Sequence, residues 1–336
     1  RDRLNTDQKI AKLLVSAYAD VSPNELFELY SDNSDDSGPT YGYYKLSEQE
    51  CYHWQDTKEE YQDTPNSLWG GYYSAIAAAN MALNAIEEKG NPASLDPQRG
   101  EALVGRAYCH FMLANIFCNA YDTHASQSLG VPYMEEVETT VSPRYERGTL
   151  EEVYRKVERD LLEGIDLISD DSYSVPKYHF TRKAAYAFAA RFYLYYMKPD
   201  FSNCDRVIDF ATRVLGTNPA DLLRNWEALG NLSVNGNVQA DAYIASSNEA
   251  NLLISSTVSN WGAIGSDYLI GPRYFHNQTL ATSETCLSSG LWGSSDYFYL
   301  KPFSTNGFVA SILRKSGLYQ GTYLYYMPVL FPTDET

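Results

Sequence analysis

The sequence predicts a mainly α protein in which amphipathic helix pairs stack on one another, followed by a loop-rich, partly irregular C-terminal half. Apolar residues recur at spacings of three and four between about residues 64 and 216, as in helices with one buried face. Capping residues precede these segments and Gly or Pro follows them, so the helices have defined ends. From about residue 220 the periodicity fades, and Gly, Ser, Asn and Thr become more frequent.

The first helix is predicted from about Thr6 to Ala19, because Thr6 can cap it. Its buried face is marked by four apolar residues: Ile10, Leu13, Leu14 and Ala17. An irregular insert follows at about 31–63, where no periodicity organises the chain. The insert contains an acidic loop at 32–38 and then a group of aromatic residues that includes Tyr44 and Trp54.

Two longer helices are expected to form an antiparallel hairpin, because only about six residues separate them. The first begins at Thr64-Pro65, a capping residue followed by a favoured first helical residue, and stops at Gly90. The second begins at Asp96-Pro97. Their apolar faces are Trp69, Tyr72, Tyr73, Ile76, Asn80, Leu83 and Ile86, and Leu103, Ala107, His110, Phe111, Ala114, Phe117, Cys118 and Tyr121.

Three more helices are predicted between about 149 and 216. Thr149 and Glu152 form a capping box for the first, and the second, from about Thr181 to Met197, is apolar almost all round and therefore buried between neighbours. The third begins at about Asn203 and carries Cys204, Ile208, Ala211 and Leu215 before Gly216. This pattern resembles the second helix of a tetratricopeptide repeat, but long insertions break the repeat's period of about 34 residues. The fold class is therefore irregular tetratricopeptide-like stacked helix pairs.

The charge balance restricts the possible partners. The formal net charge of −17 disfavours nucleic acid, polyanionic ligands and electrostatic docking on anionic lipid, whereas neutral or cationic ligands fit better. No stretch approaches roughly 18 uninterrupted apolar residues, so no transmembrane helix is expected. Tyrosine is unusually frequent, with 29 residues. Its amphipathic ring suits packing between helices and also a wet, shallow binding surface.

No catalytic or cofactor motif is present. The nucleophile elbow, the Walker loop, the GxGxxG fingerprint and the HExxH pair are all missing. The five cysteines lack CxxC spacing, and His110 on an apolar helix face indicates a packed structural residue. Charged clusters are interpreted as solvated: Glu135-Glu136, and the basic residues Arg155, Lys156 and Arg159. We therefore expect no enzymatic activity and no cofactor.

The acidic loop at 32–38 matches a calcium-binding loop only in part. Asp32, Ser34 and Asp36 alternate as calcium ligands do in an EF-hand. The glycine, however, comes at the seventh position, Gly38, and the twelfth position is Tyr43 rather than Glu. A plain polar turn is therefore favoured, and no metal site is expected.

Several sequence blocks, in order and covering about 6 to 216, resemble those of the SusD/RagB family. The signature helix is the stretch RGEALVGRAYCHFMLA at 99–114, followed by GVPY at 130–133. The helix before it, with Trp69, Tyr73, Ile76, Asn80, Leu83 and Ile86, looks like the family's first repeat helix. The stretches RGTLEEVY at 147–154 and TRKAAY at 181–186 match the next two blocks.

The resemblance implies a SusD-like fold and a surface lipoprotein of the outer membrane in Bacteroidetes. It also implies a non-catalytic protein that binds glycan or another nutrient and acts with a SusC-like TonB-dependent transporter. Membrane attachment would come only from an N-terminal lipid anchor, which is not present in this chain. The expected organisation is a helical repeat region at 1–219 and a loop-rich ligand-binding region at 220–336, parts of one domain that is C-terminally incomplete.

A glycan or oligosaccharide site is expected on the aromatic loops, because sugar rings lie on Trp and Tyr faces while polar side chains bond the hydroxyls. The candidate rings are Trp54, Trp261, Trp292, Tyr44, Tyr297 and Tyr299, and the candidate hydroxyl partners are Asp32 and Asn33. Two alternatives stay open. The chain could be a tetratricopeptide-like protein-interaction module, or, with no motif in support, a polysaccharide-degrading enzyme.

Overall fold

A computed structural model describes residues 4–36, 45–60, 62–140, 143–232, 238–259 and 273–276. The described part is mostly helical, which confirms the predicted fold class. The chain divides into two compact units that alternate along the sequence. The first comprises Arg1–Asp20, Trp69–Arg224 and Ser246–Ser256, and the second Val21–Leu68, Asn225–Ala245 and Thr257–Thr336. The boundary expected at 219 stays a prediction.

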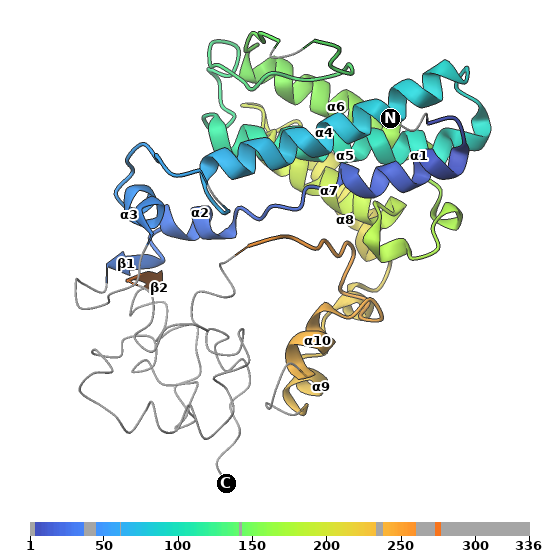
Figure 1. The fold of residues 1–336 in the computed structure, drawn as a ribbon. Helices are drawn as coiled ribbons and strands as arrows, with labels where there is room; N and C mark the ends of the chain where they lie inside the picture. Colours follow the sequence, from blue (N-terminus) through green and yellow to red (C-terminus); the bar gives the residue numbers. More distant parts are fainter. Residues whose placement is uncertain are drawn as a thin grey trace. The chain divides into compact units, whose positions relative to one another are not determined.

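The first unit carries the helices that the sequence predicts (Figure 1). Thr6, Thr149 and Thr181 cap three of them through their side-chain oxygens, as side chains of this type do at helix starts. The second helix of the hairpin ends at Phe117, so Cys118 is its C-cap residue rather than part of its face. The elements of this unit are α1 (Asp7–Leu14), η1 (Val15–Ala17), most of α4 (Pro65–Glu88), η2 (Ala93–Leu95), α5 (Asp96–Phe117), α6 (Leu150–Leu167), η3 (Asp170–Ser172), η4 (Pro176–Tyr178), α7 (Arg182–Tyr195), α8 (Cys204–Leu215) and η5 (Pro219–Leu222).

Successive helices of this unit pack side by side. Trp69 near the start of α4 contacts Phe117 at the end of α5 with ring centroids 5.0 Å apart, and Tyr73 contacts His110 one turn further in. The α4–α5 hairpin is therefore antiparallel, as predicted. The stack continues through polar contacts between the following helices: Arg106 with Asp160 for α5–α6, Glu158 with Tyr193 for α6–α7, and Tyr193 with Arg206 for α7–α8.

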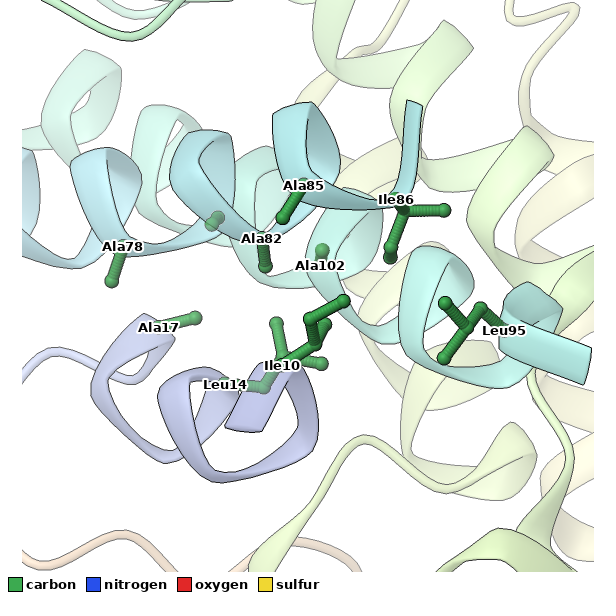
Figure 2. Close-up of a cluster of buried hydrophobic side chains, with 10 residues drawn as sticks. Ile10, Leu14, Ala17, Ala78, Ala82, Ala85, Ile86, Leu95 and Ala102 are labelled. Carbon is green, nitrogen blue, oxygen red and sulfur yellow. The ribbon is translucent and has the colours of Figure 1, made fainter. Parts of the chain in front are cut away.

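A core of small residues joins α1 to this hairpin. Ile10 and Leu14 of α1 are fully buried, and they point toward a row of alanines on α4 (Figure 2). The row continues into Ile86, with Ala102 of α5 and Leu95 beside it. Because alanine side chains are short, the helix backbones approach closely. The members of this cluster are Ile10, Leu14, Ala17, Ala78, Ala79, Ala82, Ala85, Ile86, Leu95 and Ala102.

The helices α5 and α6 cross at two glycines. A Cβ atom on Gly100 would lie 2.7 Å from the Gly164 carbonyl oxygen, and one on Gly164 would lie 2.8 Å from the Gly100 carbonyl oxygen. Any side chain at either position would push the backbones apart. The close approach places Arg106, less than two turns along α5, within reach of Asp160 on α6.

A buried polar network lies between α4, α5 and α6. Arg106 is 6 % exposed and donates from Nε to Asp160 Oδ2 at 2.6 Å and from Nη1 to Asn80 Oδ1 at 2.9 Å. His110 is fully buried and its Nε2 accepts from the Met134 amide at 2.9 Å, so its other ring nitrogen donates to the Arg106 carbonyl. Burial lowers the pKa of His110 to about 3. The structural role predicted for His110 is confirmed.

The same network holds the segment 130–138, here called the strap. Tyr133 stacks on His110 with ring centroids 3.8 Å apart and donates to Asp160 at 2.7 Å. Glu135 accepts from Lys156 and from Arg159, each at 2.6 Å. The expectation that Glu135, Lys156 and Arg159 are merely solvated is therefore wrong, because they pair across the strap and α6.

The two sides of α8 differ from the sequence-based expectation. Phe210 and Val214 are each 7 % exposed, and Phe210 stacks on Tyr193 of α7. Ile208 and Leu215, which the sequence singled out, are 63 % and 43 % exposed. The helix therefore has two apolar sides, of which one covers α7.

This difference gives a stability test for α8. Phe210→Ala should lower the free energy of unfolding by about 3 kcal/mol, because it leaves a cavity against α7. Ile208→Ala should change it by less than about 0.5 kcal/mol, because its side chain is already exposed. Urea unfolding of both variants makes the comparison. Equal losses would show that α8 packs through the other side.

The second unit contains short elements, of which α2, α3 and β1 were not predicted from the sequence. Helix α3 and strand β1 lie inside the insert that we expected to be irregular, and α2 precedes it. Strands β1 and β2 pair antiparallel, with Asp35 opposite Phe275. Both α2 and α3 pack on β2. The elements are α2 (Asn24–Leu29), β1 (Ser34–Asp36), α3 (Leu46–Tyr52), α9 (Trp226–Gly230), α10 (Val238–Ile244) and β2 (Tyr274–His276).

Candidate functional site

The candidate site centres on Trp54, directly after α3. The Trp54 amide donates to the Cys51 carbonyl at 3.0 Å, and the Gln55 amide donates to the Glu50 carbonyl at 2.8 Å. This pair of hydrogen bonds is the Schellman motif that closes many helix C-termini. Trp54 occupies the left-handed position of the motif, with φ of 56°. Glycine is the usual residue there, because other side chains crowd the backbone.

A tryptophan in this conformation costs roughly 1–2 kcal/mol relative to glycine. Strained residues of this kind concentrate at functional sites. In addition, 74 % of Trp54 is exposed. An exposed indole held by a strained backbone makes Trp54 a candidate for a ligand contact.

Tyr30, the C-cap residue of α2, packs its ring against the Trp54 indole. The two rings stack at 4.8 Å between centroids and 28° between planes. Tyr30 is half-buried, and burial raises the pKa of its hydroxyl to about 12, so it stays neutral. The stacked pair therefore forms a flat, apolar surface with a fixed orientation.

The acidic turn follows Tyr30 in the chain. The Asn33 backbone amide donates to Ser31 Oγ at 3.2 Å, and the Asn33 side-chain amide donates to Glu28 Oε2 at 3.4 Å. The Ser34 hydroxyl is buried and donates to the Glu28 carbonyl at 2.7 Å. Asp32 lies exposed at the tip of the turn. The turn is thus fixed to α2 through Glu28, and it begins directly after Tyr30 in the sequence.

Beyond the turn, an ion pair fixes β1 to β2. Arg273 donates to both carboxylate oxygens of Asp36, each at 2.7 Å. Such a bidentate pair sets the orientation of both groups. Tyr274 is 1 % exposed and its ring lies 4.9 Å from that of Tyr52, whose hydroxyl donates to Asp35. The segment that carries Trp54 therefore follows a helix, α3, that is packed against the β1–β2 pair.

The structure places three of the eight predicted site residues. All three, Trp54, Asp32 and Asn33, belong to the second unit. Trp54 contacts Tyr30, which precedes Asp32 and Asn33 closely in the sequence. The remaining five lie outside the described residues: Tyr44, Trp261, Trp292, Tyr297 and Tyr299. Sequence reasoning missed Tyr30 and Arg273, because their partners are distant in sequence and follow no periodic pattern.

Among the described residues, no group of three or more His, Cys, Asp or Glu side chains is arranged to hold a metal ion. None of the helices in the described ranges combines the length and apolar character needed to cross a membrane.

The antiparallel helix stack defines the class: a helical-repeat protein of tetratricopeptide-like architecture with an exposed aromatic surface. The sequence matches the SusD-like family model, described as "Starch-binding associating with outer membrane", over residues 1–194. The chain belongs to the SusD-like family. No curated protein matches the sequence.

Solved structures of SusD superfamily proteins have the same fold. One from Bacteroides vulgatus aligns with a TM-score of 0.53 and 21 % identity, covering 68 % of this chain and 50 % of that one. One from Bacteroides thetaiotaomicron aligns with a TM-score of 0.53 and 20 % identity, covering 67 % of this chain and 49 % of that one. One from Bacteroides fragilis aligns with a TM-score of 0.57 and 16 % identity, covering 88 % of this chain and 65 % of that one. The chain thus spans about half to two thirds of the length of these relatives.

Proposed function

We propose that this chain binds carbohydrate at the cell surface, with Trp54 as a stacking platform. The observation that carries the proposal is the exposed indole, held in the left-handed conformation and supported by Tyr30. The apolar C–H face of a sugar ring lies on such a surface, while polar groups around it bond the hydroxyls. Asp32 and Asn33 are the proposed hydroxyl partners. The family's description as starch-binding supports this class of ligand.

The proposed site includes five aromatic residues outside the described ranges: Tyr44, Trp261, Trp292, Tyr297 and Tyr299. We further propose that the protein is a non-catalytic surface lipoprotein of the outer membrane that delivers its ligand to a SusC-like TonB-dependent transporter. The net charge of −17 favours a neutral glycan over a sulfated one. Co-purification of a transporter from solubilised outer membranes, and no turnover on a polysaccharide panel, are the expected results.

Trp54 provides the direct test. A glycan array on the intact protein identifies a ligand, and calorimetry then compares variants. Trp54→Ala should weaken binding roughly tenfold or more, as for other buried aromatic contacts in interfaces. Trp54→Gly should weaken it as much, yet change the free energy of unfolding by less than about 1 kcal/mol, because relief of the strained backbone offsets the lost ring stacking.

Trp226→Ala is the matched control, since Trp226 is also an exposed tryptophan, at 48 %, but lies on α9. It should bind the glycan like the unaltered protein. The triple replacement of Trp54, Trp261 and Trp292 by Ala should abolish binding. Unchanged affinity in that folded triple variant would overturn the assignment of the site.

A further inference from the structure

A cavity of ≈ 350 Å³ lies in the first unit, between α4 and the strap. Its size is at the lower end of the range for ligand pockets, roughly 300–1,000 Å³. The α4 wall consists of residues four apart on one face of the helix: Trp69, Tyr73, Ala77 and Met81. Ala77 is exposed and has the smallest side chain of the four, so the wall is recessed at its centre. Trp69 and Met81 remain 36 % and 38 % exposed at its ends.

The opposite wall is the strap, which supplies Pro132, Met134 and Val137. Its position is fixed by hydrogen bonds to α4. Tyr73 donates its hydroxyl proton to the Pro132 carbonyl at 2.8 Å, and the Asn80 side-chain amide donates to the Met134 carbonyl at 3.1 Å. The walls are therefore preformed, which reduces the entropy lost on binding.

The polar groups deep in this cavity already have partners inside the protein. Asn80 uses Nδ2 for the strap carbonyls and Oδ1 for Arg106, and it is only 2 % exposed. Tyr73 uses its hydroxyl proton for Pro132. What the interior offers to an occupant is thus mainly apolar surface. A sugar ring would leave hydroxyls there without partners, which is costly.

The rim has a different character. Glu136 and Glu138 lie exposed at the mouth of the cavity, and Glu138 accepts from the Tyr145 hydroxyl at 2.5 Å. An occupant with an apolar body and a positive charge beside it would complement both the interior and this rim. The chain's net charge of −17 adds attraction for a cationic partner.

We propose that this cavity binds a polypeptide segment that presents a bulky apolar side chain next to a lysine or arginine. The apolar side chain occupies the recess over Ala77, between Tyr73 and the strap. The cation lies at the rim and pairs with Glu136 and Glu138. This site is separate from the carbohydrate site proposed at Trp54, and it does not depend on that proposal.

The probes are three labelled, blocked hexapeptides measured by fluorescence anisotropy on the full chain. The first contains one leucine and one phenylalanine, with lysines between them and on both sides. The second has glutamates in place of the lysines, and the third has serines in place of the apolar residues. Only the first should bind. Ala77→Trp, which fills the recess from an exposed position, should weaken that binding roughly tenfold or more. Ser74→Trp, a change of similar size at an exposed position of α4 outside the cavity, should leave it unchanged.

The rim is tested by Glu136→Gln and Glu138→Gln. Each should weaken binding of the lysine peptide roughly two- to fivefold, as expected for partly exposed ion pairs, and raised salt should have the same effect. The glycan affinity of Ala77→Trp, measured in parallel, should be unchanged. Equal binding of the lysine and glutamate peptides, or undiminished peptide binding by Ala77→Trp, would overturn the proposal. So would loss of glycan binding by Ala77→Trp without any peptide binding, which would make the cavity a sugar site.

Discussion

Arg106→Met should lower the free energy of unfolding by about 3–5 kcal/mol, because it leaves the buried Asp160 without its main partner. The Asp160 side chain is only 1 % exposed. Although burial opposes its ionisation, the Arg106 guanidinium holds the pKa of Asp160 below its usual value. Removing the guanidinium therefore leaves a carboxylate that must either stay charged in the interior or take up a proton.

The loss should depend on pH in a predictable direction. Without Arg106, the pKa of Asp160 should rise relative to the unaltered protein, because burial is then opposed only by Tyr133 and Arg159. The folded variant therefore takes up a proton at a higher pH than the unaltered protein does. The loss in free energy of unfolding caused by Arg106→Met should thus be largest near pH 7 and smaller toward pH 4. Guanidinium unfolding at several pH values measures this difference.

Two controls separate the buried pair from ordinary ion pairs. Arg99→Met breaks the pair with Glu163, whose side chains are 33 % and 42 % exposed, and should cost less than about 1 kcal/mol. The double variant Arg106→Met with Asp160→Asn should recover part of the loss, because no charge remains buried. A single-variant loss no larger than that of Arg99→Met would show that the network does not stabilise the stack.

The helix stack could be predicted because its signals are local. Thr149 and Glu152 lie three residues apart and satisfy each other's backbone amides, so the start of α6 is readable in the sequence. Gly90 and Gly216 adopt positive φ after α4 and α8, where the sequence indicated helix ends. Periodicity also indicates that a helix has an apolar side. It does not indicate which side meets a neighbour, and this is why Ile208 and Leu215 were misplaced.

The contacts that shape both candidate sites are not local. Arg273 pairs with Asp36 across 237 residues, and Asn80 reaches the strap across 54. No sequence pattern predicts such long-range pairs, because the residues become neighbours only in the folded chain. Trp54 was predicted as a site residue from its chemistry alone, but its left-handed backbone and its contact with Tyr30 could not be. Short helices such as α3 were missed, because seven residues give too little periodicity to recognise.

Glu25→Gln should stabilise the protein at alkaline pH by several kcal/mol. Glu25 is 4 % exposed, and burial raises its pKa to about 8, in spite of the nearby Lys45 ammonium. Glu48 and Asp63 repel its charged form further. In the unfolded chain the same group titrates near its ordinary value of 4.5. Between these two values the folded state holds a proton that the unfolded state has released.

The sign of the effect follows directly. The contribution of Glu25 to stability is fully present below about pH 4.5 and is lost progressively as the pH rises toward 8. Glutamine cannot ionise, so the advantage of Glu25→Gln should grow by up to about 1.4 kcal/mol per pH unit across this window and then level off. Urea unfolding at pH 5, 6.5, 8 and 9 gives the curve. Glu87→Gln, which removes an exposed carboxylate from α4, reports the effect of one negative charge alone. A constant difference between Glu25→Gln and the unaltered protein at all four pH values would show that Glu25 is charged in the folded state, and Lys45 would then be the partner that keeps it so.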